Sequence, residues 1–344
     1  MKGAIIGDII GSAYEFSNIS TKDFPLFSGQ SRFTDDTVMT CAVAKVMTDC
    51  RKNGEEITAE KIVSVMQGVG RGYPDAGYGA RFINWMFSDD PQPYNSCGNG
   101  SAMRISAVGF LAESEEEVKV LSEKISAVSH NHPEGIKGAE CTAMCIYMAR
   151  KGFDKDEIKA RVESDYYVLD RTCDEYRREM NGMHGKELCR ISVPQALECF
   201  FESTGFEDCI RNCISIGGDS DTIAAIAGGI AEAYYGVQDN IWKEAEEFLD
   251  DELKEIVREM YEYKPLTVSY EQFEALVKKD FEKDLPNSAP EQRDRYFYGS
   301  EAQSYLRQEY DSYYRKYHGF DIGKRQFRNY AVSTVSFCLT MMYE

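Results

Sequence analysis

The sequence predicts an all-α fold, and three of its features lead to this expectation. Apolar residues recur at the three- and four-residue spacing of a helix along most of the chain. Alternating runs rich in β-branched residues, which would indicate strands, are few. Hydrophobic residues make up 43% of the 344 residues, which is enough for a well-buried core. We therefore expect a folded protein built around one large helical body.

Individual helices are indicated by apolar stripes and by capping residues. One stripe follows Asp36 and a second follows Asp221. Ser114 and Asp154 each stand three residues before a glutamate that can reach back to the helix start, which is the pattern of a capping box. Further helices are expected near residues 58–71, 99–112, 133–151, 189–203, 206–216 and 239–263.

Two stretches depart from this regular pattern. Residues 165–190 are charged and irregular, and prolines interrupt the chain before a final section rich in Tyr and mixed charge. Apolar residues return at helical spacing between Phe327 and Met342, so this last piece is expected to pack back on the body. For the tyrosines we favour simple packing over a lid, an oligomer contact or a docking face for a protein substrate.

Charge and cysteine content bear on partners and compartment. The formal net charge of −19 argues against a surface for nucleic acid or anionic membranes, although backbone amides or a cation can still hold a small anionic ligand. The amino terminus lacks the pattern of a signal peptide, and no apolar run has membrane-spanning length. The eleven cysteines lack the short paired spacings of a zinc site, and we interpret them as reduced thiols of a cytoplasmic protein, which we expect to be a monomer.

The first of two acidic motifs is FTDDTVMT, in which Thr34, Asp35 and Asp36 stand immediately before a long apolar helix. A helix cap needs one side-chain oxygen, and acids in the first turn suit the helix dipole. A single aspartate at this position would therefore be explained by capping alone.

The second acidic motif lies in GGDSDTIAAIAGGIAEAYYG, where Asp219, Asp221 and Thr222 precede a helix rich in Ala, Gly and Ile that should lie in the core. Unpaired buried carboxylates are very costly, and neither motif has an adjacent Lys or Arg. Brought together, four aspartates and two threonines would offer the hard oxygen ligands that Mg²⁺ or Mn²⁺ prefers. Spacing alone leaves this metal site and two independently capped helices equally open.

Five motifs follow one another along the chain: GDIIGSAYE, FTDDTVMT, CGNGSAMRI, HNHPEGIKGAE and GGDSDTIAAIAGGIAEAYYG. Their order resembles that of the ADP-ribosylglycohydrolases, of the dinitrogenase-reductase-activating glycohydrolase type, and five motifs in one order are far more specific than any one of them. The resemblance implies a single large orthogonal helical catalytic domain over residues 1–265. We expect residues 266–344, which lie beyond this resemblance, to form a helical C-terminal extension packed on it.

The resemblance also implies two divalent cations, Mg²⁺ or Mn²⁺, between the helices. In such enzymes the metals bind the 2- and 3-hydroxyls of the ribose next to the scissile bond and polarise a water. Cleavage at ribosyl C1 passes through an oxocarbenium-like state. Carboxylates can hold negative charge near C1, protonate the leaving group and direct water. The implied metal ligands are Thr34, Asp35, Asp36, Asp219, Asp221 and Thr222. The catalytic candidates are Glu15, Asp35 and Asp36, among which general acid and general base are not separated.

A short glycine-rich turn and a histidine are the candidates for binding the rest of the substrate. The turn in SCGNGS enters a helix, so its amides could hold a pyrophosphate, although a plain turn before a helix has the same pattern. His130 is, by resemblance, a candidate phosphate contact, whereas His132 and Pro133 are expected to shape the loop. The substrate-binding residues that the resemblance implies in the turn are Ser96, Gly98, Asn99, Gly100 and Ser101.

The leading hypothesis is a metal-dependent hydrolase that releases ADP-ribose from a modified side chain. Its partner would be an ADP-ribosylated protein or a small-molecule ADP-ribose conjugate, with arginine favoured as the acceptor over serine or a small molecule. One alternative is a non-catalytic ADP-ribose-binding protein or a toxin-immunity protein. Another is a metal-dependent nucleotide phosphohydrolase, which the same oxygen-rich motifs could serve.

Overall fold

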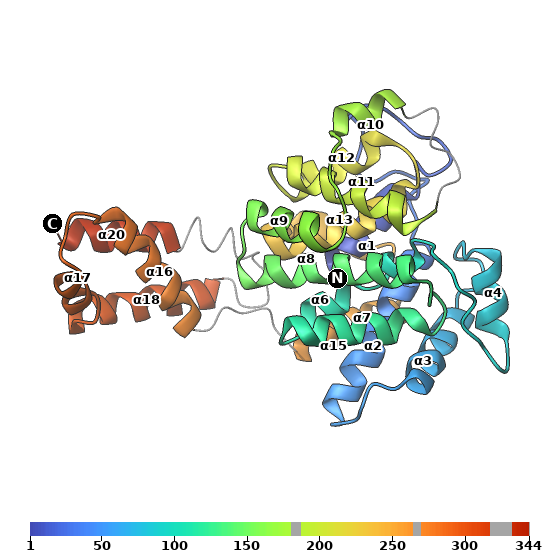
Figure 1. Ribbon diagram of the computed structural model, residues 1–344, viewed down its shortest axis with the longest axis horizontal. Helices are drawn as coiled ribbons and strands as arrows, with labels where there is room; N and C mark the ends of the chain where they lie inside the picture. Colours follow the sequence, from blue (N-terminus) through green and yellow to red (C-terminus); the bar gives the residue numbers. More distant parts are fainter. Residues whose placement is uncertain (180–186, 264–269, 317–331, 344) are drawn as a thin grey trace. The chain divides into compact units, whose positions relative to one another are not determined.

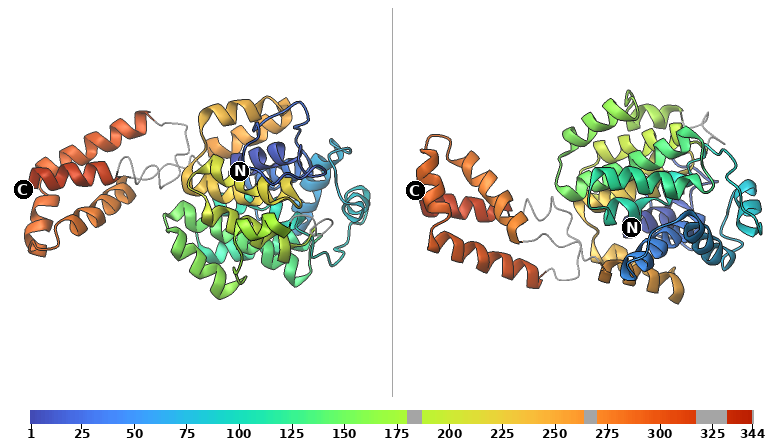
Figure 2. Two further views of the ribbon diagram at one scale, coloured as in Figure 1. Left: turned by 90° about the horizontal axis from the view of Figure 1, so that it is seen from above. Right: turned by 60° about the horizontal axis from the view of Figure 1, so that its bottom comes forward.

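The computed structural model describes residues 1–179, 187–263, 270–316 and 332–343. These residues belong to two compact units, Met1–Lys264 and Pro265–Glu344, each of which is a bundle of helices (Figures 1 and 2). Within the described residues every regular element is a helix, and the single β-bridge joins Gly98 to Leu188. The predicted all-α fold is confirmed.

The first unit holds the helices that carry the acidic motifs. It comprises α1 (Lys2–Gly11), α2 (Asp35–Lys52), α3 (Ala59–Arg71), α4 (Ala80–Phe87), α5 (Gly100–Met103), α6 (Ser106–Leu111), α7 (Glu115–Ala127), α8 (Pro133–Lys151), α9 (Lys155–Asp165), α10 (Cys173–Glu179), α11 (Cys189–Glu202), α12 (Phe206–Ile216), α13 (Ser220–Tyr235), α14 (Asp239–Glu246) and α15 (Asp251–Tyr263).

Most of the predicted helices are present, and their caps explain where they begin. Ser114 caps α7, and Asp154 forms a complete capping box with Glu157 at the start of α9. The prediction of one helix over residues 239–263 is wrong, because the Asp250 side chain accepts from the backbone N–H of Leu253 at 3.0 Å and starts a new helix. The helix expected over residues 99–112 is likewise divided, into α5 and α6.

The description of residues 165–190 as irregular is also wrong, because α10 lies within them. Thr172 precedes this helix, and its hydroxyl accepts from the backbone N–H of Glu175 at 3.2 Å. The Glu175 carboxylate in turn accepts from the backbone N–H of Thr172 at 2.8 Å. This reciprocal pair is a capping box, so the helix had a sequence signal that the dense charge of the segment obscured.

The core of the first unit is centred on the packing of α1 against α13. A Cβ atom at Gly7 would lie 2.1 Å from the backbone oxygen of Ala224, and one at Gly3 would lie 2.1 Å from that of Gly228. The two helices therefore approach each other through their backbones, which only glycine allows at these positions. This contact brings the end of α1 beside Asp221 at the start of α13.

The second unit has a core of its own. Its helices are α16 (Tyr270–Asp284), α17 (Pro290–Phe297), α18 (Ser300–Lys316) and α20 (Ser333–Tyr343). Tyr296, Tyr305 and Tyr310 pack against this core, in agreement with the preference for simple packing; the residues from 317 to 331 lie outside the described residues. That this unit packs on the first stays a prediction. The buried core residues are Phe273, Val277, Phe281, Leu285, Phe297, Ala302, Leu306, Val332, Val335 and Leu339.

Two general expectations can be compared with the described residues. None of their helices combines the length and apolar character needed to cross a membrane. All eleven cysteines are free thiols, and the pairs Cys141/Cys145 and Cys209/Cys213 are buried in the core.

Candidate active site

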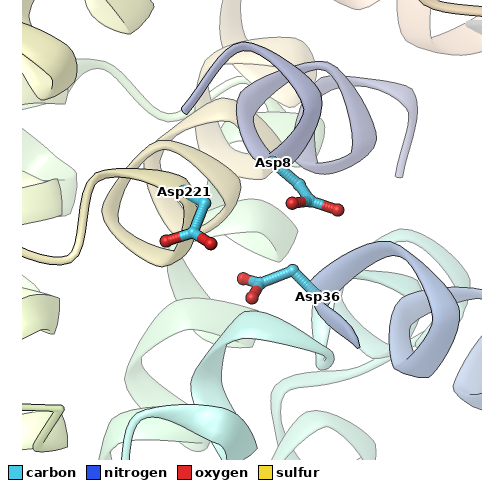
Figure 3. A group of neighbouring side chains, drawn as sticks. All are labelled: Asp8, Asp36 and Asp221. Atoms are coloured by element: carbon cyan, nitrogen blue, oxygen red, sulfur yellow. The ribbon is translucent and has the colours of Figure 1, made fainter. Parts of the chain in front are cut away.

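Three helices bring a group of carboxylates together in the first unit. Asp8 comes from α1, Asp36 from the first turn of α2 and Asp221 from the first turn of α13, and their side chains point toward one another (Figure 3). One oxygen of each lies within 4.8 Å of the others. A second group, of Glu15, Asp219 and Asp221, meets the same criterion. The two acidic motifs, far apart in sequence, therefore meet in space.

Asp8 is a member of this cluster that the sequence reasoning missed. It accepts hydrogen bonds from the backbone N–H of Thr34 at 2.9 Å, from the Thr34 hydroxyl at 2.7 Å and from the backbone N–H of Thr37 at 3.0 Å. It thereby ties α1 to the start of α2. The available signal was one acid in the helix KGAIIGDIIG, whose other residues after Lys2 are apolar.

Thr34 has a structural role that competes with the predicted role as a metal ligand. Its hydroxyl donates to Asp8 and also caps α2 by accepting from the backbone N–H of Asp36 at 3.3 Å. One lone pair of the hydroxyl oxygen is left for another partner. Thr34 does not line the cavity described below.

Asp36 and Asp221, like Asp8, are buried members of the acidic cluster. Asp36 Oδ2 accepts from the Thr222 hydroxyl at 3.1 Å, and Asp221 Oδ1 accepts from the backbone N–H of Thr222 at 2.9 Å. Asp36 Oδ1 is buried and has no hydrogen-bond partner in the described residues. Burial first, and the neighbouring carboxylates second, raise the pKa of Asp36 and of Asp221. A bound divalent cation would offset the burial and mutual repulsion of these carboxylates.

The outer carboxylates are only partly buried, and their pKa values are shifted in the same direction. Burial, followed by the charge of Asp8, raises the pKa of Asp35 to about 8. Burial, followed by the charge of Asp219, raises the pKa of Glu15 to about 7. Asp219 Oδ2 accepts from Asn99 Nδ2 at 2.6 Å, which directs this carboxylate toward the glycine turn. Glu15 and Asp35 therefore titrate close to neutral pH while no cation is bound.

Asn18 holds the segment that carries Glu15 against the second acidic motif. Its Nδ2 donates to the backbone oxygens of Tyr14 at 2.7 Å and Gly218 at 3.0 Å, and its Oδ1 accepts from the Gly218 N–H at 3.0 Å. Gly218 has a φ of +83°, which favours glycine at this position. Asn18 is thus a positioning residue that the sequence reasoning did not identify.

All of the carboxylates described above except Asp8 line a cavity of about 690 Å³, which is within the size range of small-molecule sites. Of the predicted site residues, eleven line it: Glu15, Asp35, Asp36, Ser96, Gly98, Asn99, Gly100, His130, Asp219, Asp221 and Thr222. Arg81, Tyr94, Arg104 and Glu187 also line it and were not predicted. The cavity therefore joins the acidic motifs to the glycine turn and to His130.

The glycine turn is held in place by the chain that precedes α11. The backbone N–H of Asn99 donates to the backbone oxygen of Glu187, and the backbone N–H of Cys189 donates to the backbone oxygen of Cys97, both at 3.1 Å. Ser101 is buried behind the turn, where its hydroxyl donates to the Gly135 oxygen at 2.8 Å, and it does not line the cavity. Because α5 has only four residues, its dipole adds little to anion binding.

The two histidines of SHNHPEGIKGAE have different environments. His132 is the N-cap of α8, and its Nδ1 accepts from the backbone N–H of Glu134 at 3.0 Å, as expected of a residue that shapes the loop. His130 is buried and lines the cavity. Burial, followed by the charge of Arg104, lowers the pKa of His130, so its ring is neutral at physiological pH.

Comparison with known proteins identifies the class to which this fold and site belong. A family model of the ADP-ribosylglycohydrolases matches residues 1–268. The chain therefore belongs to the ADP-ribosylglycohydrolase family, and the expected resemblance and enzyme class are confirmed.

Individual relatives are more distant. ADP-ribosylhydrolase ARH3 of Homo sapiens is 26% identical over 314 residues, which cover 69% of this chain and 84% of that protein. ADP-ribosylarginine hydrolase Tri1 of Pseudomonas putida (strain GB-1) is 25% identical over 261 residues, covering 68% of this chain and 69% of that protein. A solved structure described as an ADP-ribosylglycohydrolase-related protein complex has the same fold, with a TM-score of 0.55 at 20% identity over 76% of this chain and 96% of that one.

Proposed function

We propose that this protein is a divalent-metal-dependent hydrolase that releases ADP-ribose from a modified side chain, with arginine favoured over serine or a small molecule. The observation that carries the proposal is the buried carboxylate cluster, with its unpartnered Asp36 Oδ1 in the described residues, beside a cavity that the glycine turn and His130 also line. Buried carboxylates without cationic partners are stable only when protonated or bound to a cation.

The oxygen ligands fit Mg²⁺ or Mn²⁺ in number and type. One cation would be held by the group around Asp36 and Asp221, and a second by the group around Glu15 and Asp219. The predicted oxygens of Thr34, Asp35 and Thr222 lie next to these groups in sequence. Bound there, divalent cations would compensate the negative charge and hold ribose hydroxyls and a water.

The roles of the chain's own residues follow from their positions. The partly buried carboxyls of Glu15 and Asp35 lie where they can exchange protons with substrate and water, whereas Asp36 is fixed by Thr222. Negative charge held near C1 favours the oxocarbenium-like state. The general acid and the general base both come from the set Glu15, Asp35 and Asp36, within which the two roles are not separated. Asn99 orients Asp219.

The rim of the cavity favours a cationic acceptor. Glu15 and Glu187 are acids of the lining, and the Phe16 side chain beside them is 83% exposed. A guanidinium group can stack on an exposed aromatic ring while it pairs with neighbouring carboxylates. This combination supports arginine, as does the similarity to Tri1, which is named as an ADP-ribosylarginine hydrolase.

Product analysis tests the proposal. The protein with Mg²⁺ is incubated with ADP-ribosyl-arginine, ADP-ribosyl-serine and O-acetyl-ADP-ribose, and free ADP-ribose is quantified. We expect release from the arginine conjugate, loss of release in Asp36→Asn and Asp221→Asn, and full release in Asp89→Asn, a control on the exposed surface. Phosphate or AMP as product would favour the phosphohydrolase, and tight ADP-ribose binding without any release would favour the reader or toxin-immunity protein.

The remaining expectations concern binding partners, location in the cell and oligomeric state. With a net charge of −19, we expect no binding to nucleic acid or to anionic membranes. A cytoplasmic location and a monomeric state stay predictions.

A further inference from the structure

A hydrogen-bonded chain of three residues lies in the cavity wall behind the glycine turn, and the proposed hydrolysis does not explain it. It begins at Arg104, which is 1% exposed. Arg104 Nη2 donates to the Ser129 hydroxyl at 2.8 Å and to the Ile125 backbone oxygen at 3.3 Å, while its Nε has no partner in the described residues. The guanidinium lies 5.7 Å from the centre of the Phe82 ring.

Arg104 is a buried cation that forms no ion pair with a carboxylate in the described part of the chain. Burial lowers the pKa of Arg104 to about 10, which leaves the guanidinium charged at neutral pH. Burying a charge without an opposite charge beside it is unfavourable. Because the residue also lines the cavity, an anionic ligand in the cavity would offset that cost.

Ser129 links Arg104 to His130. Its hydroxyl oxygen lies 2.8 Å from His130 Nδ1. Arginine can only donate hydrogen bonds, so the Ser129 oxygen is the acceptor of the bond from Arg104. The single hydroxyl hydrogen is then left to donate, and Nδ1 is its one acceptor among the described residues. A proton on Nδ1 would leave this buried hydroxyl hydrogen unsatisfied, which is unfavourable.

The other ring nitrogen of His130 faces the glycine turn. A Cβ atom built on Gly100 would lie 3.2 Å from Nε2, and one built on Gly98 would lie 3.6 Å from it. The rings of Tyr94 and Phe82 are neighbours in the lining, with centroids 5.7 Å and 6.4 Å from that of His130. The imidazole is therefore held with Nε2 next to the cavity.

We propose that Arg104 and Ser129 are positioning residues that hold His130 in the Nε2–H tautomer, so that it donates one hydrogen bond to an anionic oxygen of the ligand at the glycine turn. Arg104 fixes the direction of the Ser129 hydroxyl, Ser129 occupies Nδ1, and Nε2 carries the hydrogen. That the anionic ligand is ADP-ribose rests on the proposed function, whereas the tautomer does not.

Nitrogen NMR of histidine tests the tautomer directly. The protein is labelled with ¹⁵N-histidine, and the signals of His130, one of four histidines, are assigned by comparison with His130→Gln. In the parent we expect an unprotonated Nδ1 and a protonated Nε2. Ser129→Thr keeps the hydroxyl and should keep this pattern, whereas Ser129→Ala should give a mixture of tautomers. A protonated Nδ1 in the parent, or an unchanged pattern in Ser129→Ala, overturns the inference.

Calorimetry with ADP-ribose measures the consequence. Ser129→Ala should weaken binding about tenfold, which corresponds to roughly 1.4 kcal/mol, and Ser129→Thr should bind like the parent. Equal melting temperatures of the two variants exclude a folding defect. Parent-like binding by Ser129→Ala would overturn the role in ligand binding. A parent with the expected tautomer that does not bind ADP-ribose would instead overturn the proposed function and uphold the positioning of His130.

Discussion

Removing divalent cations should make the stability of this protein depend strongly on pH in the neutral range. In the metal-free folded protein, burial raises the pKa of Asp8, Asp36 and Asp221, and that of Asp35 to about 8. In the unfolded chain the same groups titrate near pH 4. Between pH 4 and pH 8 the folded protein therefore binds more protons than the unfolded chain. By linkage, the free energy of unfolding falls as the pH rises through this interval.

The size of the effect follows from the shift. One pKa unit corresponds to about 1.4 kcal/mol, so the rise for Asp35 from 3.8 to about 8 would cost roughly 6 kcal/mol at pH 8 if the surroundings stayed fixed. Water entry and side-chain movement act like a higher effective dielectric and reduce this to about 3 kcal/mol. For a unit of this size, that corresponds to a fall in melting temperature of roughly 10 °C.

Thermal unfolding with and without Mg²⁺ measures this effect. Melting curves are recorded at about pH 5 and about pH 8, each in EDTA and in saturating Mg²⁺. The quantity compared is the difference in melting temperature between Mg²⁺ and EDTA at each pH, because the net charge of −19 affects both conditions. We expect Mg²⁺ to stabilise little at the lower pH and by roughly 10 °C at the higher pH. Asp36→Asn should melt higher than the parent in EDTA at the higher pH and gain little from Mg²⁺, whereas Asp89→Asn should behave like the parent.

Two results would refute the reasoning. If the metal-free parent were as stable at pH 8 as at pH 5, the carboxylates would not be paying a burial penalty. If Mg²⁺ stabilised the protein equally at both pH values, its binding would not be coupled to the deprotonation of the cluster.

Further predictions concern packing and the acceptor. Gly7→Ala should destabilise the first unit by about 3 kcal/mol in urea unfolding, because the new Cβ would lie 2.1 Å from the Ala224 oxygen; Gly68→Ala, in open space on α3, should cost nothing. A Gly7→Ala protein as stable as the parent would contradict the close packing of α1 on α13. Phe16→Ala should raise KM for ADP-ribosyl-arginine severalfold and leave KM for ADP-ribosyl-serine unchanged, with Phe16→Tyr behaving like the parent. An equal change for both conjugates would show that the ring does not select the acceptor.

The acidic motifs were predictable because their chemistry conflicts with their surroundings. Asp35 and Asp36 before an apolar helix, and Asp221 before one rich in Ala and Gly, indicate buried acids without partners, which a shared cation would neutralise. What the sequence could not decide was whether the motifs meet. The hydrogen bond from Thr222 to Asp36, at 3.1 Å, shows that they do.

The sequence did not reveal residues whose roles depend on a contact with a distant part of the chain. Asn18 is explained only when Gly218 is known to lie beside it, and Ser129 only when Arg104 is known to reach across from the turn after α5. A hydrophilic residue in a loop or a lone arginine in a turn carries no local pattern that predicts such a partner. The segment with α10 differs, because the capping-box spacing of Thr172 and Glu175 is a local signal for the start of a helix.

Asp8 shows how one packing contact determines both the fold and the site. An acid in an apolar helix would normally face water, yet glycines on α1 allow α13 to pack so closely that a Cβ at Gly11 would lie 2.4 Å from the Asp221 Cα. That approach leaves Asp8 no exposure, and three hydrogen bonds from Thr34 and Thr37 stabilise its carboxylate there. Asp8 thus fixes the start of α2 and adds negative charge beside Asp36, so the contact that completes the core also creates the demand for a cation.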